Sequence, residues 1–532
     1  MKSPILGSSY VIRSVNAADN RMVNLYPEVI AEGGKEPAYL QRCPGYALVA
    51  TIGTGPIRGL YTLNGDIFVV SGNYLYGLGD NFEMQIPLAL QQDGMLLLQD
   101  GGEIEVESGT PIGYISGTGP VSMADNGTQI FIAANPAGYI YNADTEEFGE
   151  ITDEDFPGAV TVGYLDGYFV FNEPNSQRVW VTQLLDGTSI DPLDFASAEG
   201  SPDGLVSLIV DHREAWLFGT NSVEVWYNAG EADFPLSRIQ GAYNEIGCIA
   251  PYSVAKMDNS VFWLGADARG QGIVYRAQGY QGQRISTHAV EFAIQQYDNL
   301  EDATAYTYQQ DGHTFYVLNF TNADATWVYD AATGSWHERA GFENGAFVRH
   351  RGNNHVRFSG QPVIGDYENG NLYAFSLDVF SDNGVAQKWL RSWRALPTGQ
   401  NNLKRTAHHS LQIDCETGVG LAGYGIDDYK YLASQLNAII DTENDKNIIL
   451  EYDVTTGAVP QLMLRWSDDG GHTWTDERST SMGRIGKYGT RAIFRRLGMT
   501  TKLRDRVYEI SGTDPVKVAI MGAELEISGT NA

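Results

Sequence analysis

The feature that most constrains this chain of 532 residues is a strand–turn–strand unit that recurs through its first two-thirds. The unit is clearest at residues 161–182, TVGYLDGYFVFNEPNSQRVWVT. It reads as a strand, an Asp166-Gly167 turn, a strand with Phe169 and Phe171 on one face, and a third strand through Trp180. Asp-Gly between β-rich runs predicts a hairpin, because a type I′ turn requires positive φ at both central residues.

Similar units recur from Arg58 onwards. The predicted turns are Asn64-Gly65, Asn126-Gly127, Asp166-Gly167, Asp211-His212, Asp258-Asn259, Asp311-Gly312 and Gly352-Asn353. Turns spaced roughly 40 to 60 residues apart, with three or four strands between them, are typical of β-propeller blades. One blade cannot bury both of its faces, so the blades must pack around a common axis. No WD or kelch signature repeats, and the sequence therefore predicts an irregular propeller of six or seven blades.

The rest of the chain surrounds this repeat with three further segments. Residues 1–55 look like an extended N-terminal arm, which could close a ring by donating a strand. The propeller occupies residues 56–383, with residues 85–117 as an insertion or a partial extra blade. Residues 384–410 form a basic and aromatic linker, and residues 411–532 hold short alternating strands that predict a β-sandwich. The expected fold class is all-β, with one helix at residues 287–297.

The negative charge is confined to the propeller part. The chain has a net charge of −31, whereas residues 384–532 contain 18 basic and 18 acidic residues. Such a surface disfavours tight binding to phosphates. Three widely spaced cysteines suggest a reducing compartment, without a disulfide framework. No long apolar run or secretory signal is recognisable, so we expect no membrane insertion.

One strip in the second domain is basic. Its candidate residues are Arg484, Lys487, Arg491, Arg495, Arg496, Lys502, Arg504 and Arg506, with Asp505 as the one acid among them. The strip could touch nucleic acid, but few aromatic residues interleave it. We favour a protein–protein contact with an acidic neighbour.

A second motif in this domain fits the Asp-box pattern S-x-D-x-G-x-T-W. Its residues are Ser467, Asp469, Gly471, Thr473 and Trp474. Ser467 and Asp469 are expected to hold a tight hairpin through side-chain to backbone hydrogen bonds, with Trp474 packed beneath it. Sialidases carry several such boxes together with an arginine triad, whereas this chain has one box. We interpret it as a structural turn.

Other polar groups favour ordinary structural roles. His350 and His355 are expected on a surface turn, and His408-His409 at a surface or interface. Residues 152–155, TDED, could bind Ca²⁺, although a solvated loop is the simpler interpretation. The chain has no HExxH, P-loop, GxSxG or zinc-spacing motif, and we predict no catalytic residue, no cofactor and no metal site.

Several blocks resemble the tail-hub (nozzle) proteins of short-tailed bacteriophages, which are also called packaged-DNA stabilisation proteins. The blocks lie at residues 9–29, 44–45, 201–228, 246–265, 285–291, 388–394, 411–420, 464–474 and 495–527. Residues 85–117 and 423–446 look particular to this chain.

The resemblance implies a structural virion protein with no catalytic residues. Six copies would form a tube below the portal and adaptor rings, extend the DNA channel, hold packaged double-stranded DNA in, and present sites for tail spikes, fibres or a plug. The chain would then be assembled in the host cytoplasm. An acidic lumen would let the duplex slide, because repulsion acts within roughly 8 to 10 Å at physiological salt. The N-terminal arm could reinforce the closed ring.

Two other classes of function remain open from the sequence. One is a carbohydrate-active propeller, either a sialidase-like enzyme or a glycan-binding receptor protein. The other is a tail fibre or capsid decoration protein.

Overall fold

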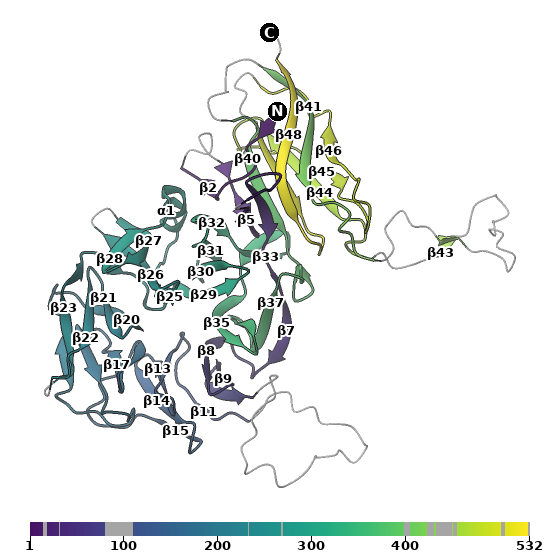
Figure 1. Ribbon diagram of the computed structural model, residues 1–532. Helices are drawn as coiled ribbons and strands as arrows, with labels where there is room; N and C mark the ends of the chain where they lie inside the picture. The colour runs from purple at the N-terminus through teal and green to yellow at the C-terminus, as the bar shows by residue number, and fades with distance from the viewer. Residues whose placement is uncertain are drawn as a thin grey trace, which may run out of the picture. The chain divides into compact units, whose positions relative to one another are not determined.

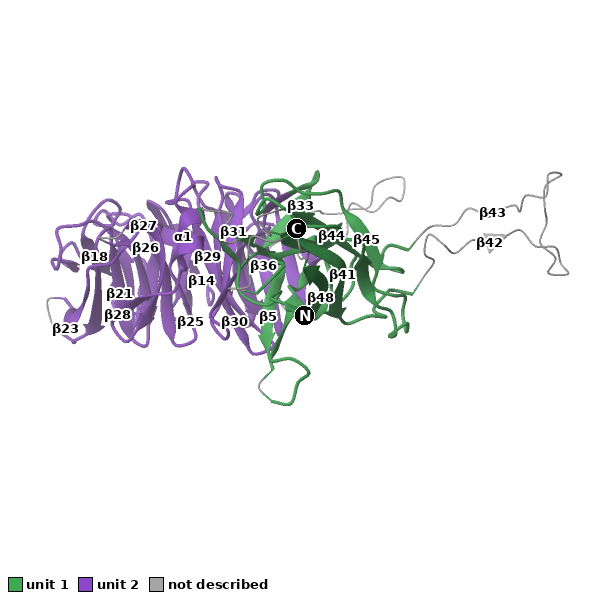
Figure 2. Ribbon diagram, turned by 90° about the horizontal axis from the view of Figure 1, so that it is seen from above, with its two compact units in different colours: residues 1–45, 337–346, 377–532 green, residues 46–336, 347–376 purple. Residues whose placement is uncertain are grey.

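The computed structural model describes residues 1–13, 19–30, 32–79, 110–231, 234–267, 270–397, 405–422, 430–431, 449–450, 455–501 and 506–529. These residues form two compact units, drawn in different colours in Figure 2. Unit 1 comprises Met1–Gly45, His337–Ala346 and Leu377–Ala532, and unit 2 comprises Tyr46–Trp336 and Phe347–Ser376. In the part of the chain that is described, no helix is long and apolar enough to cross a membrane.

Unit 2 contains seven antiparallel sheets or parts of sheets, each of four or five strands, and in six of them the strands follow chain order. The sixth is part of a nine-stranded sheet, and the seventh is part of a six-stranded sheet. The first three sheets are β8 (Ile57–Leu63), β9 (Asp66–Ser71), β10 (Tyr74–Leu78) and β11 (Gly113–Tyr114); β12 (Ser122–Asp125), β13 (Gln129–Ala134), β14 (Ala137–Asn142) and β15 (Glu147–Glu150); and β16 (Val162–Leu165), β17 (Tyr168–Asn172), β18 (Arg178–Val181) and β19 (Phe195–Ser197).

The next three sheets repeat this order. They are β20 (Leu205–Asp211), β21 (Glu214–Gly219), β22 (Val223–Asn228) and β23 (Leu236–Asn244); β24 (Gly247–Cys248), β25 (Ala255–Met257), β26 (Ser260–Asp267), β27 (Gly270–Gln278) and β28 (Gln281–Arg284); and β29 (Thr304–Gln310), β30 (His313–Phe320), β31 (Ala325–Asp330) and β32 (Ser335–Glu338).

The seventh sheet departs from chain order. It consists of β35 (Gly352–Phe358), β36 (Gln361–Asp366), β37 (Asn371–Ser376) and, beside β37, the N-terminal strand β7 (Gly45–Thr51). A strand from the start of the chain thus completes the last sheet, as expected for a ring closed by strand donation.

The sheets of unit 2 close into a ring. Their first strands contact one another in the order β8, β12, β16 and β20, then β25, β29 and β35, with the short 3-10 helix η3 (Pro251–Ser253) touching both β20 and β29. Strand β35 also contacts β8, so the last sheet meets the first (Figure 1). Together with the blade-like sheets, this closure confirms the predicted β-propeller.

Apolar side chains fill the space between neighbouring sheets. Between the second and third sheets, Phe131, Phe169, Phe171 and Trp180 belong to one buried cluster, as predicted from residues 161–182. The ring-closing junction between the seventh and first sheets buries Ile57, Val69, Phe358 and Val363 in the same way. Burying such side chains contributes about 1.5 to 3 kcal/mol each, so every junction stabilises the ring.

The predicted turns are mostly correct. Positive φ values occur at both residues of Asn64-Gly65, Asp166-Gly167, Asp258-Asn259 and Asp311-Gly312, as type I′ turns require. One predicted turn is shifted by one residue: the turn after β20 is His212-Arg213, with φ of 49° and 61°. At Asn126-Gly127 the positive φ occurs at Gly127 alone, with a value of 96°.

The seventh predicted turn is wrong. Gly352 and Asn353 lie inside β35, and the turn of that sheet is Ser359-Gly360, with φ of 47° and 77°. The backbone at Gly352 lies close to Tyr306: a Cβ on Gly352 would be 2.9 Å from the Tyr306 hydroxyl oxygen. Glycine is therefore needed at this position because there is no space for a side chain, and not because the chain turns there.

The predicted helix is α1 (His288–Ile294). Thr287 caps it, since its hydroxyl accepts a hydrogen bond from the Val290 amide. Val290 and Ile294 are fully buried on the side of the helix that packs into unit 2.

Unit 1 contains two facing sheets. The first has the order β46 (Ala492–Arg495), β41 (Thr406–Cys415), β48 (Ala519–Gly529), β6 (Ala38–Arg42) and β5 (Leu25–Val29), with β1 (Lys2–Ser3) also paired to β48. The second has the order β4 (Met22–Val23), β40 (Trp389–Arg394), β47 (Val507–Gly512), β44 (Gln461–Ser467) and β45 (Arg478–Ser481). Short two-residue or four-residue strands complete the described elements: β2 (Tyr10–Val11), β3 (Asp19–Asn20), β33 (Ala340–Glu343), β34 (Ala346–Arg349), β38 (Ser381–Asp382), β39 (Val385–Ala386), β42 (Lys430–Tyr431) and β43 (Ile449–Leu450).

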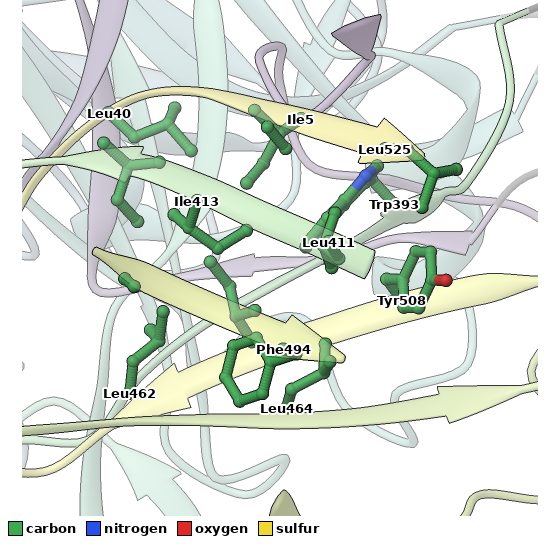
Figure 3. Packing of buried hydrophobic residues seen from close by; sticks show 14 of the residues in the cluster. Ile5, Leu40, Trp393, Leu411, Ile413, Leu462, Leu464, Phe494, Tyr508 and Leu525 are labelled. Atoms are coloured by element: carbon green, nitrogen blue, oxygen red, sulfur yellow. The ribbon is translucent and has the colours of Figure 1, made fainter. Parts of the chain in front are cut away.

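One hydrophobic core lies between these sheets. Leu40, Leu411, Ile413 and Leu525 from the first sheet pack with Trp393, Leu462, Leu464 and Tyr508 from the second (Figure 3). Both sheets are therefore buried on one face, which is the β-sandwich expected from the sequence.

The sandwich includes more of the chain than residues 411–532. Residues 1–45 fold back on their own chain: Lys2 and Ser3 pair with Glu524 and Ala523 of β48, and Met22 pairs with Arg391 of β40. The hypothesis that an extended arm reinforces a ring of copies loses its basis, because these strands complete the chain's own sandwich.

The segment expected as a linker, residues 384–410, also contains a core strand. Trp389 and Trp393 of β40 are almost fully buried. Arg391 is buried too, which lowers its pKa to about 10, and its Nε donates to the carbonyl of Ile5 at 2.7 Å. Backbone carbonyls of the N-terminal residues thus satisfy the arginine inside the unit.

Candidate interaction surfaces

The basic strip lies along β46 and the loops that flank it. Ala492 and Phe494 of β46 point into the core, so the residues that alternate with them face outwards. Arg491, Arg495 and Arg496 are exposed, and Lys487 is exposed in the preceding loop. Arg484 is half-buried. We call these five cations the basic strip.

Arg506 does not belong to this surface. It is 3% exposed, and its Nε and Nη2 donate to the two carboxylate oxygens of Asp468 at 2.7 and 2.8 Å. Burial opposes its charge, but the hydrogen bonds and the charge of Asp468 raise its pKa above the ordinary value. Arg506 thus forms a salt bridge with Asp468 inside the sandwich. Lys502 and Arg504 lie outside the described residues.

Large apolar side chains stand exposed beside the strip. Ile485 is 62% exposed, Tyr488 is 76% exposed and Met499 is 49% exposed. A surface that combines cations with exposed apolar groups is suited to a protein partner with carboxylates and apolar groups of its own.

The Asp-box forms a hydrogen-bonded loop after β44. Ser467 Oγ accepts from the Gly471 amide at 2.8 Å, and Asp469 Oδ1 accepts from the amides of His472 and Thr473 at 3.0 and 2.8 Å. The hydrogen bonds from Ser467 and Thr473 lower the pKa of Asp469 far below its usual range. The side-chain oxygens of Ser467, Asp469 and Thr473 are thus hydrogen-bonded within this loop.

Trp474 lies against an arginine. The Arg465 guanidinium sits 4.8 Å from the Trp474 ring centroid, and Arg478 covers the Trp466 ring at the same distance. Such cation–π contacts contribute about 0.5 to 1 kcal/mol each at partly exposed sites. Each of these guanidinium groups covers one face of its indole ring.

The histidines are more buried than expected. His350 is 1% exposed and stacks on Phe375, so the surface-turn prediction is wrong for it. His408 is 2% exposed, and its Nδ1 lies 2.7 Å from the Tyr508 hydroxyl, which contradicts a surface position. His409 is exposed on the opposite side of β41. Each sits in a strand or beside one, where alternation places every second side chain inside.

The acidic residues 152–155 form a turn. Asp153 Oδ1 accepts from the Asp155 amide, and its Oδ2 accepts from the Ile190 amide at 3.1 Å. Within the described ranges, no group of three or more His, Cys, Asp or Glu side chains could hold a metal ion.

A central cavity of about 450 Å³ lies within unit 2. One strand of every sheet contributes to its wall, namely β8, β12, β16, β20, β25, β29 and β35, as expected for the axis of a propeller. Its charged lining residues are Arg58, Asp125 and Lys256. Arg58 is engaged by backbone carbonyls, donating to Gly119 at 2.6 Å, Gly72 at 2.9 Å and Ser116 at 2.9 Å. A cavity of this volume has the size of a small-molecule site.

A second surface was missed by the sequence reasoning. Leu184, Leu185 and Leu193 are 58%, 59% and 76% exposed on the loop between β18 and β19. A signal was present nearby: residues 59–177 contain 18 Asp and Glu but no Lys, Arg or His. The net charge of the whole propeller does not reveal that its acidic residues outnumber its basic ones most strongly in these first blades.

Two family models match this chain in the same order as its two folds. The model described as "Bacteriophage P22 Gp10, beta-propeller" matches residues 101–380, and "Bacteriophage P22 Gp10, beta-sandwich" matches residues 437–528. The chain belongs to the phage P22 Gp10 family. This is the tail-hub or nozzle family of podoviruses, as the sequence resemblance implied. The chain is therefore a phage tail structural protein, and its family places it in the virion.

Other comparisons add little. No curated protein sequence matches the chain. Among solved structures, the N-terminal domain of Nup159 has a TM-score of 0.37 at 13% identity, covering 68% of this chain and 99% of that one. The extracellular domain of the hybrid two-component system BT4673 from B. thetaiotaomicron has a TM-score of 0.40 at 11% identity, covering 78% of this chain and 48% of that one. At such low TM-scores these similarities carry no argument.

Proposed function

We propose that this protein is the tail hub of a short-tailed phage, a non-enzymatic ring that extends the DNA channel below the portal and adaptor. The observation that carries the proposal is the family match of both domains in order, the propeller at residues 101–380 and the sandwich at residues 437–528. In this role six copies assemble in the host cytoplasm, help to retain packaged DNA, and anchor spikes, fibres or a plug. We also infer that the propeller has seven blades, one for each sheet of unit 2.

The DNA channel in this proposal runs between the copies and not through a propeller. The central cavity of about 450 Å³ suits a small molecule and is far too small for a duplex. A channel wall built from chains with a net charge of −31 repels phosphates at close range and lets the duplex slide.

A carbohydrate-active propeller is less well supported. The one Asp-box lies in unit 1, and its atoms bond to its own loop. Among the described residues that line the central cavity, Arg58 is the single arginine, and its guanidinium is engaged by carbonyl oxygens. Neither site offers the arginine triad that a sialidase uses.

Electron microscopy of virions tests the proposal, with the protein marked by an antibody or a fused tag. We expect six copies in a ring directly below the head–tail connection. The proposal is wrong if the protein is absent from the tail axis, forms trimeric fibres, or is a monomer that cleaves a sialoside.

A further inference from the structure

The loop that carries the exposed leucines of the third sheet is hydrogen-bonded to a turn that carries exposed carboxylates. Leu184, Leu185 and Leu193 belong to residues 183–194, and Ile190 of the same loop donates its amide to Asp153. Glu154 and Asp155 follow Asp153 and are exposed, as is Glu150 at the end of β15. We call Leu184, Leu185, Leu193, Glu150, Glu154 and Asp155 the acidic leucine patch.

The loop that presents these leucines is held in place. The Leu185 amide donates to the Gly167 carbonyl at 2.8 Å, and the Gly187 amide donates to Gln129 Oε1 at 2.9 Å. Leu185 has a φ of 61°, a left-handed conformation that is unfavourable for a residue other than glycine. The backbone thus holds three leucines towards solvent in a defined geometry, as interaction surfaces commonly do.

The basic strip has the complementary composition. Its cations Arg491, Arg495 and Arg496 stand beside Ile485 and Tyr488, which are 62% and 76% exposed. The patch belongs to unit 2, and the strip belongs to unit 1. The two surfaces carry charge of opposite sign, and both expose apolar side chains.

We propose that the basic strip of one copy docks on the acidic leucine patch of a second copy. This inference rests on the proposed ring of copies. Chains that each carry a net charge of −31 repel one another, so their contact needs a place where charge is locally complementary. Two different surfaces that meet head to tail generate a ring when the rotation closes.

Charge reversal tests this contact with the full chain and with phage heads that lack the protein. The strip variant carries Arg491→Glu, Arg495→Glu and Arg496→Glu, and the patch variant carries Glu150→Lys, Glu154→Lys and Asp155→Lys. The number of copies bound per head is measured for each protein. We expect each variant alone to bind at least about tenfold fewer copies, because like charges then face each other.

A mixture of the two variants gives the sharper result. In an alternating ring of even number, the acidic strip of one variant meets the basic patch of the other, so an equal mixture should restore binding. A matched control carries Lys2→Glu, Lys35→Glu and Lys517→Glu, three exposed lysines of unit 1 outside the strip. The control should bind as the unaltered chain does, since exposed ion pairs contribute little.

The outcomes separate this inference from the proposed function. If the strip variant alone forms complete rings, the contact is wrong but the hub stands. If single variants fail and the mixture does not restore binding, the strip meets a different protein or DNA, and the contact between copies is wrong. If the unaltered chain never binds heads, the proposed function itself fails.

Discussion

His355 lies among aromatic rings at the junction of the sixth and seventh sheets. Its ring centroid is 6.1 Å from those of both Tyr306 and Tyr308, and Tyr308 in turn packs on Phe375. Burial lowers the pKa of His355 to about 4. An imidazole of this kind is neutral at physiological pH and resists protonation, because burial removes the water that would solvate its charge.

We predict a stability loss on acidification that depends on His355. Its folded-state pKa is below the unfolded value of about 6.5, so its stabilising contribution is complete above that pH and is lost as the pH falls towards 4. The loss should amount to roughly 3 kcal/mol over that range. Thermal unfolding of unaltered chain and His355→Gln, compared at about pH 7.5 and about pH 4.5, measures it.

The His355→Gln variant should lose less stability on acidification than the unaltered chain. His409→Gln is the matched control, since His409 is exposed on β41. An equal pH response of all three proteins would contradict the prediction.

Ser467 is the residue of the Asp-box on which stability should depend most. It is 1% exposed, and its hydroxyl donates to Asp469 and accepts from the Gly471 amide. We predict that Ser467→Ala lowers the free energy of unfolding by about 1 to 3 kcal/mol, because a buried amide loses its acceptor. Urea unfolding measures the change. Ser479→Ala, at an exposed position of β45, should change it by less than about 0.5 kcal/mol, and equal effects would refute the assignment.

The Asp-box and the basic strip differ in how far the sequence alone could predict them. The Asp-box is local, so its pattern specified the hydrogen bonds of Ser467 and Asp469 directly. The strip depends on which residues of a run face the core. Arg495 and Arg506 belong to the same run, but Arg506 pairs with Asp468 inside the domain. That pairing joins residues distant in sequence, and no local pattern reveals it.

At the scale of elements, the ring depends on one junction that the chain makes between distant strands. Ile57 of β8 is fully buried against Phe358 and Val363 of the seventh sheet. Gly365 of β36 faces Ile57 closely: a Cβ on Gly365 would lie 2.4 Å from Ile57 Cγ2. The absence of a side chain at Gly365 therefore lets the last sheet close on the first.

We predict a non-additive pair of substitutions at this junction. Gly365→Ala should cost about 1 to 3 kcal/mol through overpacking, and Ile57→Ala about 2 to 5 kcal/mol through a cavity. The double variant should cost less than the sum by about 1 kcal/mol or more, because the alanine methyl enters the space that Ile57 leaves. Urea unfolding of the four proteins gives the coupling.

Strict additivity would mean that the first and last sheets do not pack as described. A pair without contact supplies the control: Gly65→Ala combined with Ile57→Ala should be additive, since a Cβ on Gly65 meets no atom within 4 Å.

The elements that the sequence predicted best are those defined by local turns. Asp166-Gly167 specifies its hairpin through the dihedral angles that glycine permits, and Thr287 specifies the start of α1 through its cap. Strand β7 and the pairing of β1 with β48 could not be read in this way. They bring together residues from opposite ends of the chain, and their partners are selected by burial in the complete fold.

At the scale of the whole molecule, charge is distributed unevenly among the parts. Residues 59–177 carry 18 acids without any cation, whereas residues 384–532 are neutral in sum. In the proposed hub, the acidic propeller would let DNA pass without binding tightly to the channel wall. The localised basic strip would serve the proposed contact between copies.

The last prediction concerns DNA itself. We expect the purified chain to bind double-stranded DNA more weakly than about 10⁻⁴ M at about 150 mM salt, the weak end of non-specific binding, because its net charge of −31 opposes contact with phosphates. Fluorescence anisotropy with a labelled duplex measures the affinity. Neutralising Asp144, Glu146 and Glu147 to Asn, Gln and Gln should strengthen binding only at low salt, since screening acts within roughly 8 to 10 Å at physiological ionic strength. A dissociation constant in the micromolar range that the strip variant abolishes would show instead that the basic strip is a DNA-binding surface.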